Sequence, residues 1–124
     1  MTNLPSLYAR VVAKRPDLAV KIDRGEGCEQ RIERGWDAWQ YNTYYGDDRQ
    51  IVNFTSDEIA AALILARWVE ALPVNHHLSY DMNDDEQKVW RVFKLHEASG
   101  RFEAGPDRNT PIEALAAFYL GETT

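Results

Sequence analysis

Residues 54–73 read FTSDEIAAALILARWVEALP and form the most clearly patterned stretch of the chain. Thr55-Ser56-Asp57-Glu58 has the spacing of a capping box, in which the Thr55 hydroxyl accepts a hydrogen bond from the Glu58 amide. Phe54 and Ile59 have the spacing of a hydrophobic staple across the same helix start. Pro73 cannot continue a helix. The stretch therefore predicts a helix from the capping box to residue 72.

This predicted helix has little polar surface. After its first turn only Arg67 and Glu70 are charged. A helix this apolar is covered on more than one side, so we expect it to be the central buried helix of the fold. One predicted apolar face consists of Ile59, Leu63, Ala66 and Val69, and the other consists of Leu65, Trp68 and Leu72.

The residues before it predict two shorter helices. Apolar residues recur at helical spacing over residues 4–14, and Pro16 ends that pattern. Leu18, Ala19 and Ile22 suggest a second short helix before Gly25-Glu26-Gly27. We therefore expect residues 1–35 to be an N-terminal helical segment.

Two regions predict antiparallel strands. The first is a hairpin: a strand in which Trp39, Tyr41, Thr43 and Tyr45 alternate with other residues, a turn at Gly46 and a return strand at residues 50–54. The alternative for this region is a helix, because Ile32, Trp36 and Trp39 also fit helical spacing. Residues 78–82, 88–95 and 101–104, separated by turn residues, predict a three-stranded meander.

The last predicted helix begins at Thr110 and ends at Gly121. Pro111 occupies its first position, Glu113 completes a second capping box, and glycine is the usual residue just after a helix. Its predicted buried stripe is Ile112, Leu115, Ala116, Tyr119 and Leu120. The pattern as a whole predicts one α+β domain over residues 1–124, with an antiparallel sheet layered between helices (an α/β/α sandwich) over residues 36–121.

Composition narrows the classes of function. The net charge is −6, which argues against non-specific nucleic-acid binding, because such binding depends on Lys and Arg neutralising phosphates. Residues 1–35 carry a small positive excess and residues 36–124 a large negative one. The acidic part is either a solvated surface or a face for a basic partner.

The sequence also indicates a compartment. Cys28 is the single cysteine, which excludes a disulfide within the chain and favours the cytoplasm. Residues 1–5 do not form a signal peptide, and the most apolar stretch is too short to cross a bilayer, so we expect no membrane association.

No motif for catalysis or metal binding is evident. Adjacent residues on a strand point to opposite faces, so His76 and His77 cannot both bind one ion. The acidic run at residues 81–86 imitates the opening of a calcium loop, but Glu86 stands where the required glycine belongs. Cys28 has no activating motif around it. We therefore expect no catalytic residues, metal or cofactor, and a protein that is not an enzyme.

Two features suggest binding instead. Residues 36–45 hold five aromatic residues, which either pack beneath a helix or form a recognition surface. Residues 107–110 precede a helix and form either a plain capped turn or, with Arg108, an anion site. The candidate partner- or ligand-binding residues are Trp36, Trp39, Tyr41, Tyr44, Trp90, Arg91, Arg108 and Asn109.

Three motifs occur in order along residues 36–121. Phe54 to Ala62 is an aromatic-Ser/Thr-x-Asp start to an Ala-rich helix, Trp90-Arg91-Val92 is a Trp-x-Val strand, and Thr110 to Leu115 is a Thr-Pro-x-x-Ala-Leu helix. With these motifs, residues 36–121 resemble small phage proteins of the phage ABA sandwich family.

The resemblance implies a phage or prophage origin and a place in the host bacterial cytoplasm. By analogy with small phage proteins of comparable fold, it suggests an anti-defence inhibitor, such as an anti-CRISPR-type protein, that binds a host bacterial protein. We also expect self-association, at least as a dimer. The alternative is a sponge for a nucleotide immune signal, with Arg108, Arg91 and Lys94 near the phosphate and Trp90, Trp39 or Tyr41 stacked on the base.

Overall fold

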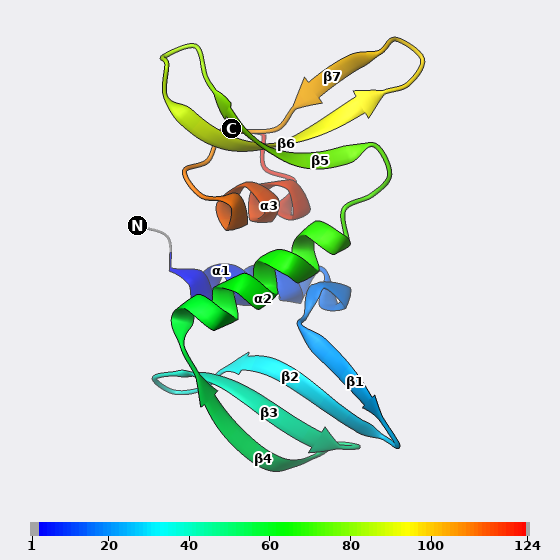
Figure 1. Ribbon diagram of the computed structural model, residues 1–124, viewed down its shortest axis with the longest axis vertical. Helices are drawn as coiled ribbons and strands as arrows, with labels where there is room; N and C mark the ends of the chain where they lie inside the picture. The colour runs from blue at the N-terminus through cyan, green and yellow to red at the C-terminus, as the bar shows by residue number, and fades with distance from the viewer. Residues whose placement is uncertain (1–2, 124) are drawn as a thin grey trace.

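The computed structural model describes residues 3–123, and residues 1, 2 and 124 lie outside that range. The helices lie between two antiparallel sheets (Figure 1). In chain order the elements are α1 (Leu4–Lys14), the 3-10 turn η1 (Pro16–Leu18), β1 (Lys21–Gly25), β2 (Cys28–Arg34), β3 (Trp39–Tyr45), β4 (Asp48–Thr55), α2 (Asp57–Glu70), β5 (His76–Met82), β6 (Lys88–His96), β7 (Arg101–Ala104) and α3 (Pro111–Leu120).

The predicted α+β class with antiparallel strands is confirmed. The strands, however, form two sheets, ordered β1-β2-β3-β4 and β5-β6-β7. The helices cover one face of each sheet, so each sheet has an outer face with none of the described helices on it (Figure 1). The order of layers is therefore sheet, helices, sheet, where the sequence had predicted helices outside a sheet.

The first helix agrees with its prediction, and the segment after it does not. Helix α1 spans residues 4–14 and buries Leu7, Tyr8 and Val11. The predicted second helix at residues 18–22 is absent, because η1 ends at Leu18 and the chain continues as β1. The Ile32 amide donates to the Val20 carbonyl at 3.0 Å, so this main chain pairs with β2.

Strands β1 and β2 form a hairpin where we had predicted a helical segment. Gly25, Glu26 and Gly27 all have positive φ, the backbone of a tight hairpin turn. The predicted hairpin of β3 and β4 is confirmed, with Gly46 in its turn at φ 64°. Its register shifts between Thr43 and Tyr44, where β4 holds an additional residue.

Helix α2 begins one residue later than predicted. Ser56, not Thr55, is its N-cap, and the Ser56 hydroxyl accepts the Ile59 amide at 3.2 Å. The predicted staple does not form, since Phe54 and Ile59 are 71% and 55% exposed. The buried stripe is Ala60, Ile64 and Trp68. This stripe is offset by one residue from the predicted face that began at Ile59.

The second half of the chain follows its prediction closely. The meander β5-β6-β7 is confirmed. Thr110 caps α3 by accepting the Glu113 amide at 3.2 Å, and Gly121 ends the helix at φ 72°. The buried surface of α3 is wider than the predicted stripe and includes Ala114 and Ala117, because α3 lies between the sheet β5-β6-β7 and the helices α1 and α2 (Figure 1).

A row of aromatic rings joins the layers. Tyr8 of α1 meets Trp39 of β3 edge to face at 5.8 Å and stacks on Trp68 of α2 at 6.2 Å. Trp68 in turn meets Tyr119 of α3 at 6.4 Å. We call Tyr8, Trp39, Trp68 and Tyr119 the aromatic row.

The polar ends of the aromatic row bond to main chain. The Tyr8 hydroxyl accepts the Val20 amide at 2.9 Å, and the Trp68 indole donates to the Leu18 carbonyl at 3.1 Å. The Tyr119 hydroxyl donates to the Trp68 carbonyl at 2.5 Å. Buried polar groups are thereby satisfied while the rings fill the core.

The buried stripe of α2 predicts unequal effects of two matched substitutions. Ile64→Ala removes a fully buried side chain and should lower the free energy of unfolding by about 2–5 kcal/mol. Ile59→Ala, on the exposed side of the same helix, should change it by no more than about 0.5 kcal/mol. Urea denaturation of both variants measures the difference. Equal losses would contradict the observed stripe.

The buried tyrosine in the aromatic row predicts a loss of stability at alkaline pH. Burial raises the pKa of the Tyr8 hydroxyl above its ordinary value of 10.0; the bond from Val20 opposes this, and nearby Glu33 adds to it. The folded state therefore holds this proton more tightly than the unfolded state. The free energy of unfolding should fall as pH rises above about 10.

Urea denaturation of wild type and Tyr8→Phe between pH 8 and pH 11 tests this prediction. The variant should be less stable at pH 8, because the Val20 amide loses its partner. The stability difference between the two proteins should then shrink as pH passes about 10. A constant difference across that range would show that Tyr8 does not contribute to the alkaline loss.

Candidate functional site

The most exposed large hydrophobic side chain in the described residues is Trp36. It lies in the turn between β2 and β3, where the Gly35 amide donates to the Ala38 carbonyl at 2.9 Å. Its side chain is 99% exposed. A Cβ at position 35 would collide with the Gln40 side chain, so glycine there lets Gln40 pack against the turn.

Gln40 connects this turn to an exposed ring on β4. Gln40 and Phe54 are direct partners in the β3–β4 register and therefore project from the same face. Trp39 precedes Gln40 on β3, and Ile32 precedes the Gln40 partner Glu33 on β2; both are in the core with Tyr8. Neighbours on a strand point to opposite faces, so Gln40 and Phe54 are on the outer face. We call Trp36, Gln40 and Phe54 the Trp36 surface.

A polar network occupies the outer face beside the Trp36 surface. The Tyr44 hydroxyl donates to Glu33 Oε1 at 2.5 Å. The Asn42 amide nitrogen donates to Gln40 Oε1 at 3.1 Å and to Glu33 Oε1 at 3.4 Å. Arg31 lies 4.3 Å from the centroid of the Tyr44 ring. These side chains bury one another although no described helix covers them (Figure 1).

Asn42 is the most buried member of this network. It is 1% exposed, and its Oδ1 has no hydrogen-bond partner among the described groups. The network therefore holds Asn42 through its amide nitrogen alone. Burying the unpaired oxygen lowers the stability of the fold. The result is an ordered polar layer beside the apolar side chains Val52 and Phe54.

The candidate residues from β3 divide between the two faces of the sheet. Trp39 is 1% exposed and belongs to the aromatic row, and Tyr41 packs half-buried against the core. Tyr44 is on the outer face, in the network. Trp39 and Tyr41 thus pack beneath the helices, as one of the two interpretations predicted. For Trp36, the recognition surface stays a prediction.

The other candidate residues lie with the second sheet, across the helix layer (Figure 1). Trp90 packs against Tyr80 at 4.7 Å, and Arg91 pairs with Asp107 at 2.6 Å. Arg108 donates to Glu122 at 2.9 Å, and Asn109 is an exposed residue of the turn before α3. The structure therefore does not bring the eight candidate residues together into one site.

Two further features were not predicted from sequence. On the outer face of the second sheet, His77 stacks on Phe93 at 5.8 Å, and Phe102 meets both rings. No sequence signal shows that residues on three different strands meet. On the first sheet, the exposure of Phe54 was also not predicted, because the sequence had placed its ring in a hydrophobic staple against Ile59.

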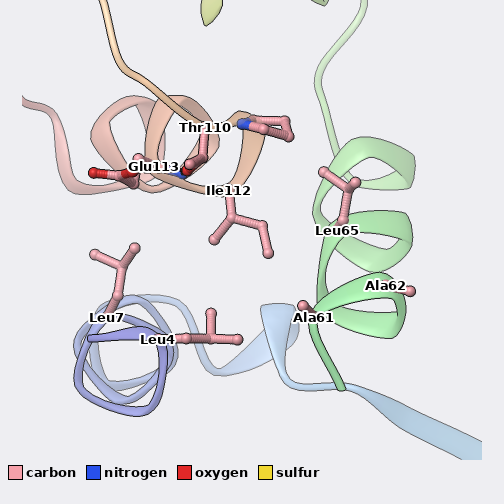
Figure 2. Close-up of a pocket in the computed structure, with 9 residues that line it drawn as sticks. Leu4, Leu7, Ala61, Ala62, Leu65, Thr110, Ile112 and Glu113 are labelled. Carbon is pink, nitrogen blue, oxygen red and sulfur yellow. Dashed lines mark hydrogen bonds between the residues drawn. The ribbon is translucent and has the colours of Figure 1, made fainter. Parts of the chain in front are cut away.

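The second feature is a pocket of about 370 Å³ among the three helices (Figure 2). Small side chains at Ala61 and Ala62 leave the space open, and the Thr110–Glu113 pair is its polar edge, with the Thr110 hydroxyl donating to Glu113 Oε1 at 2.8 Å. The remaining lining is apolar and comes from Leu4, Leu7, Leu65, Pro111 and Ile112. It can admit an apolar group.

Metal and membrane features can be stated for residues 3–123. No group of three or more His, Cys, Asp or Glu residues in that range is placed to hold a metal ion. His76 contacts Phe118 of α3 while His77 contacts Phe93 on the opposite face, as expected for neighbours on a strand. Within the same range, none of the helices has the length and apolar character needed to cross a bilayer.

Comparisons with known proteins place the chain in no family. No family model, curated protein or solved structure matches it. The resemblance to the phage ABA sandwich family therefore stays a prediction.

The polar network predicts a specific shift in tyrosine titration. The hydrogen bond to Glu33 raises the pKa of the Tyr44 hydroxyl above 10.0, with further contributions from partial burial and from the carboxylate charge. Glu33→Gln removes that charge and should lower the Tyr44 pKa towards 10. NMR titration of ¹³C-labelled tyrosine measures it, with Tyr44→Phe identifying the resonance. An unchanged Tyr44 titration in Glu33→Gln would contradict the assigned bond.

Proposed function

We propose that the chain is a non-catalytic binding protein that engages another protein through the Trp36 surface. The observation that carries this proposal is the exposure of two large rings: Trp36 in the turn before β3 is 99% exposed, and Phe54 on β4 is 71% exposed. Tryptophan is among the residues that contribute most to protein interfaces, because its large ring loses few rotamers on burial. A tryptophan with no packing role in its own fold gains most from a partner.

The neighbouring polar network supports the same function. Tyr44, Glu33 and Asn42 already bond to one another in the free chain. Side chains that are held in place before binding lose little conformational entropy when a partner docks. The outer face thus combines an apolar anchor with an ordered polar surround, the arrangement typical of interface centres and rims.

The charges of the outer face indicate the kind of partner. Lys21, Arg31 and Arg49 share this face with Asp23, Glu29 and Glu33, as the strand registers show. Positive and negative residues are equal in number, so apolar contact and hydrogen bonding, not a field of one sign, would select the partner. The phage resemblance makes a protein of the host bacterial cytoplasm the first class to test.

Nucleotide capture has less support. A phosphate site needs a cationic group that is not already neutralised, and Arg91 and Arg108 both contact carboxylates, those of Asp107 and Glu122. Trp90 and Arg91 are adjacent on β6 and point to opposite faces. We therefore retain protein binding as the proposed function.

Paired affinity captures from a bacterial host lysate test the proposal. Wild type and Phe102→Ala, a control for an exposed ring on the other sheet, should retain the same partner, and Trp36→Ala should lose it. Titration of the purified partner should show affinity for Trp36→Ala reduced about 30-fold or more, corresponding to about 2 kcal/mol. The free energy of unfolding of Trp36→Ala should remain within about 0.5 kcal/mol of wild type.

Two outcomes would count against this function. Equal capture by wild type and Trp36→Ala would exclude the Trp36 surface as the binding site. Capture of no protein by wild type, from lysates of several candidate hosts, would remove the support for protein binding altogether.

A further inference from the structure

The strand β4 is an unprotected sheet edge. Edge strands have main-chain groups that can pair with another chain, and charged side chains normally discourage such pairing. The other described edges carry charges: β1 has Lys21 and Asp23, and β7 has Arg101 and Glu103. β5 has Asp81. In β4 the charged residues Asp48 and Arg49 stand at its start, before the register shift, and residues 51–55 carry no charge.

The same five residues expose apolar side chains on both faces. Ile51 is 50% exposed on the inner side, and Val52 and Phe54 are 39% and 71% exposed on the outer side. The register shift opposite Thr43 and Tyr44 lies before Ile51, so residues 51–55 are a regular extended segment. An edge that is regular, uncharged and partly apolar is a template for strand addition.

The charges beside this segment favour an antiparallel second copy. Arg49 precedes the neutral segment and Asp57 follows it. Asp57 lies 3.9 Å from Arg34 of its own chain, but 79% of its side chain is exposed and can also meet a second cation. Two copies in antiparallel order bring Arg49 of each copy towards Asp57 of the other. Parallel order would bring like charges together, which is unfavourable.

The side-chain pattern selects one register. If the two-fold axis passes through Asn53, Val52 of each copy lies opposite Phe54 of the other on the outer face. Ile51 then lies opposite Thr55 on the inner face. Directly opposite residues in an antiparallel pair share a face, so Val52 meets the apolar ring of Phe54, and Ile51 meets the methyl group of Thr55. The two Asn53 amides face each other, and each can donate and accept.

We propose that two copies of this chain associate through β4, paired antiparallel about Asn53, to form one continuous eight-stranded sheet. The contact places the Trp36 surfaces of both copies on the same side of that sheet. It shares Phe54 with the Trp36 surface, but it does not depend on the proposed protein partner, and the Trp36 side chain has no part in it.

Analytical ultracentrifugation over a range of protein concentrations tests the association. The mass of the wild type should rise from one chain towards two as concentration increases. Val52→Lys adds a charge at the centre of the edge and should weaken the dimer at least tenfold. Phe102→Lys, an equivalent change at an exposed position of the other sheet, should dimerise as wild type does, and so should Trp36→Ala.

Cysteine cross-linking tests the register in a Cys28→Ser background. Opposite residues in an antiparallel pair have Cα atoms about 4.5–5.5 Å apart, within disulfide range. Asn53→Cys should therefore oxidise to a disulfide-linked dimer. Ile51→Cys should not, because four residues along the strands, about 13 Å, separate the two copies of position 51.

The wild-type mass and the cross-links bear on the proposal independently of how the lysine variants fold. A wild-type mass of one chain at all concentrations would overturn it. Dimers that survive Val52→Lys but not Phe102→Lys would place the interface on the other sheet. Cross-linking of Ile51→Cys in preference to Asn53→Cys would refute the pairing about Asn53.

Discussion

The aromatic row holds the layers of this fold together. Each of its rings comes from a different element, and the contact from Trp39 through Tyr8 and Trp68 to Tyr119 runs from the first sheet to the helix that supports the second. The hydroxyl and indole groups of Tyr8, Trp68 and Tyr119 bond to main chain of other segments, which fixes the position of each ring. Because the polar ends are satisfied, the rings can be buried without the cost of unpaired donors.

The helix layer explains why the candidate surfaces lie far apart. Each sheet uses one face to cover the helices, so each has a second face exposed to solvent or to a partner (Figure 1). On the first sheet that face is lined by residues that bond to one another, and Trp36 lies in the turn that joins β2 and β3. The acidic excess of the chain is not concentrated there.

Local signals predicted the elements better than their faces. Thr110, Pro111 and Gly121 identified α3 correctly because cap chemistry depends on only a few adjacent residues. Strand β2 was missed because four of its seven residues are charged and belong to a polar outer layer or a strand end, which weakens the alternation of a half-buried strand. Of the candidate residues, Trp36 proved exposed and Trp39 buried, although sequence treated them alike. Trp36 is exposed because it lies in the turn that begins at Gly35. The sequence did not predict this turn, since residues 32, 36 and 39 also fit the spacing of a helix.

The order of the strands has a consequence for folding kinetics. In both sheets every strand pairs with its neighbour in the sequence, so each sheet can form by closing short hairpins. The contacts of the aromatic row instead join residues as distant as positions 8, 39, 68 and 119. Long loops must close before those contacts form. The chain therefore loses conformational entropy before it gains the free energy of burying the rings. We therefore expect the two meanders to form early and their docking across the helices to set the folding rate.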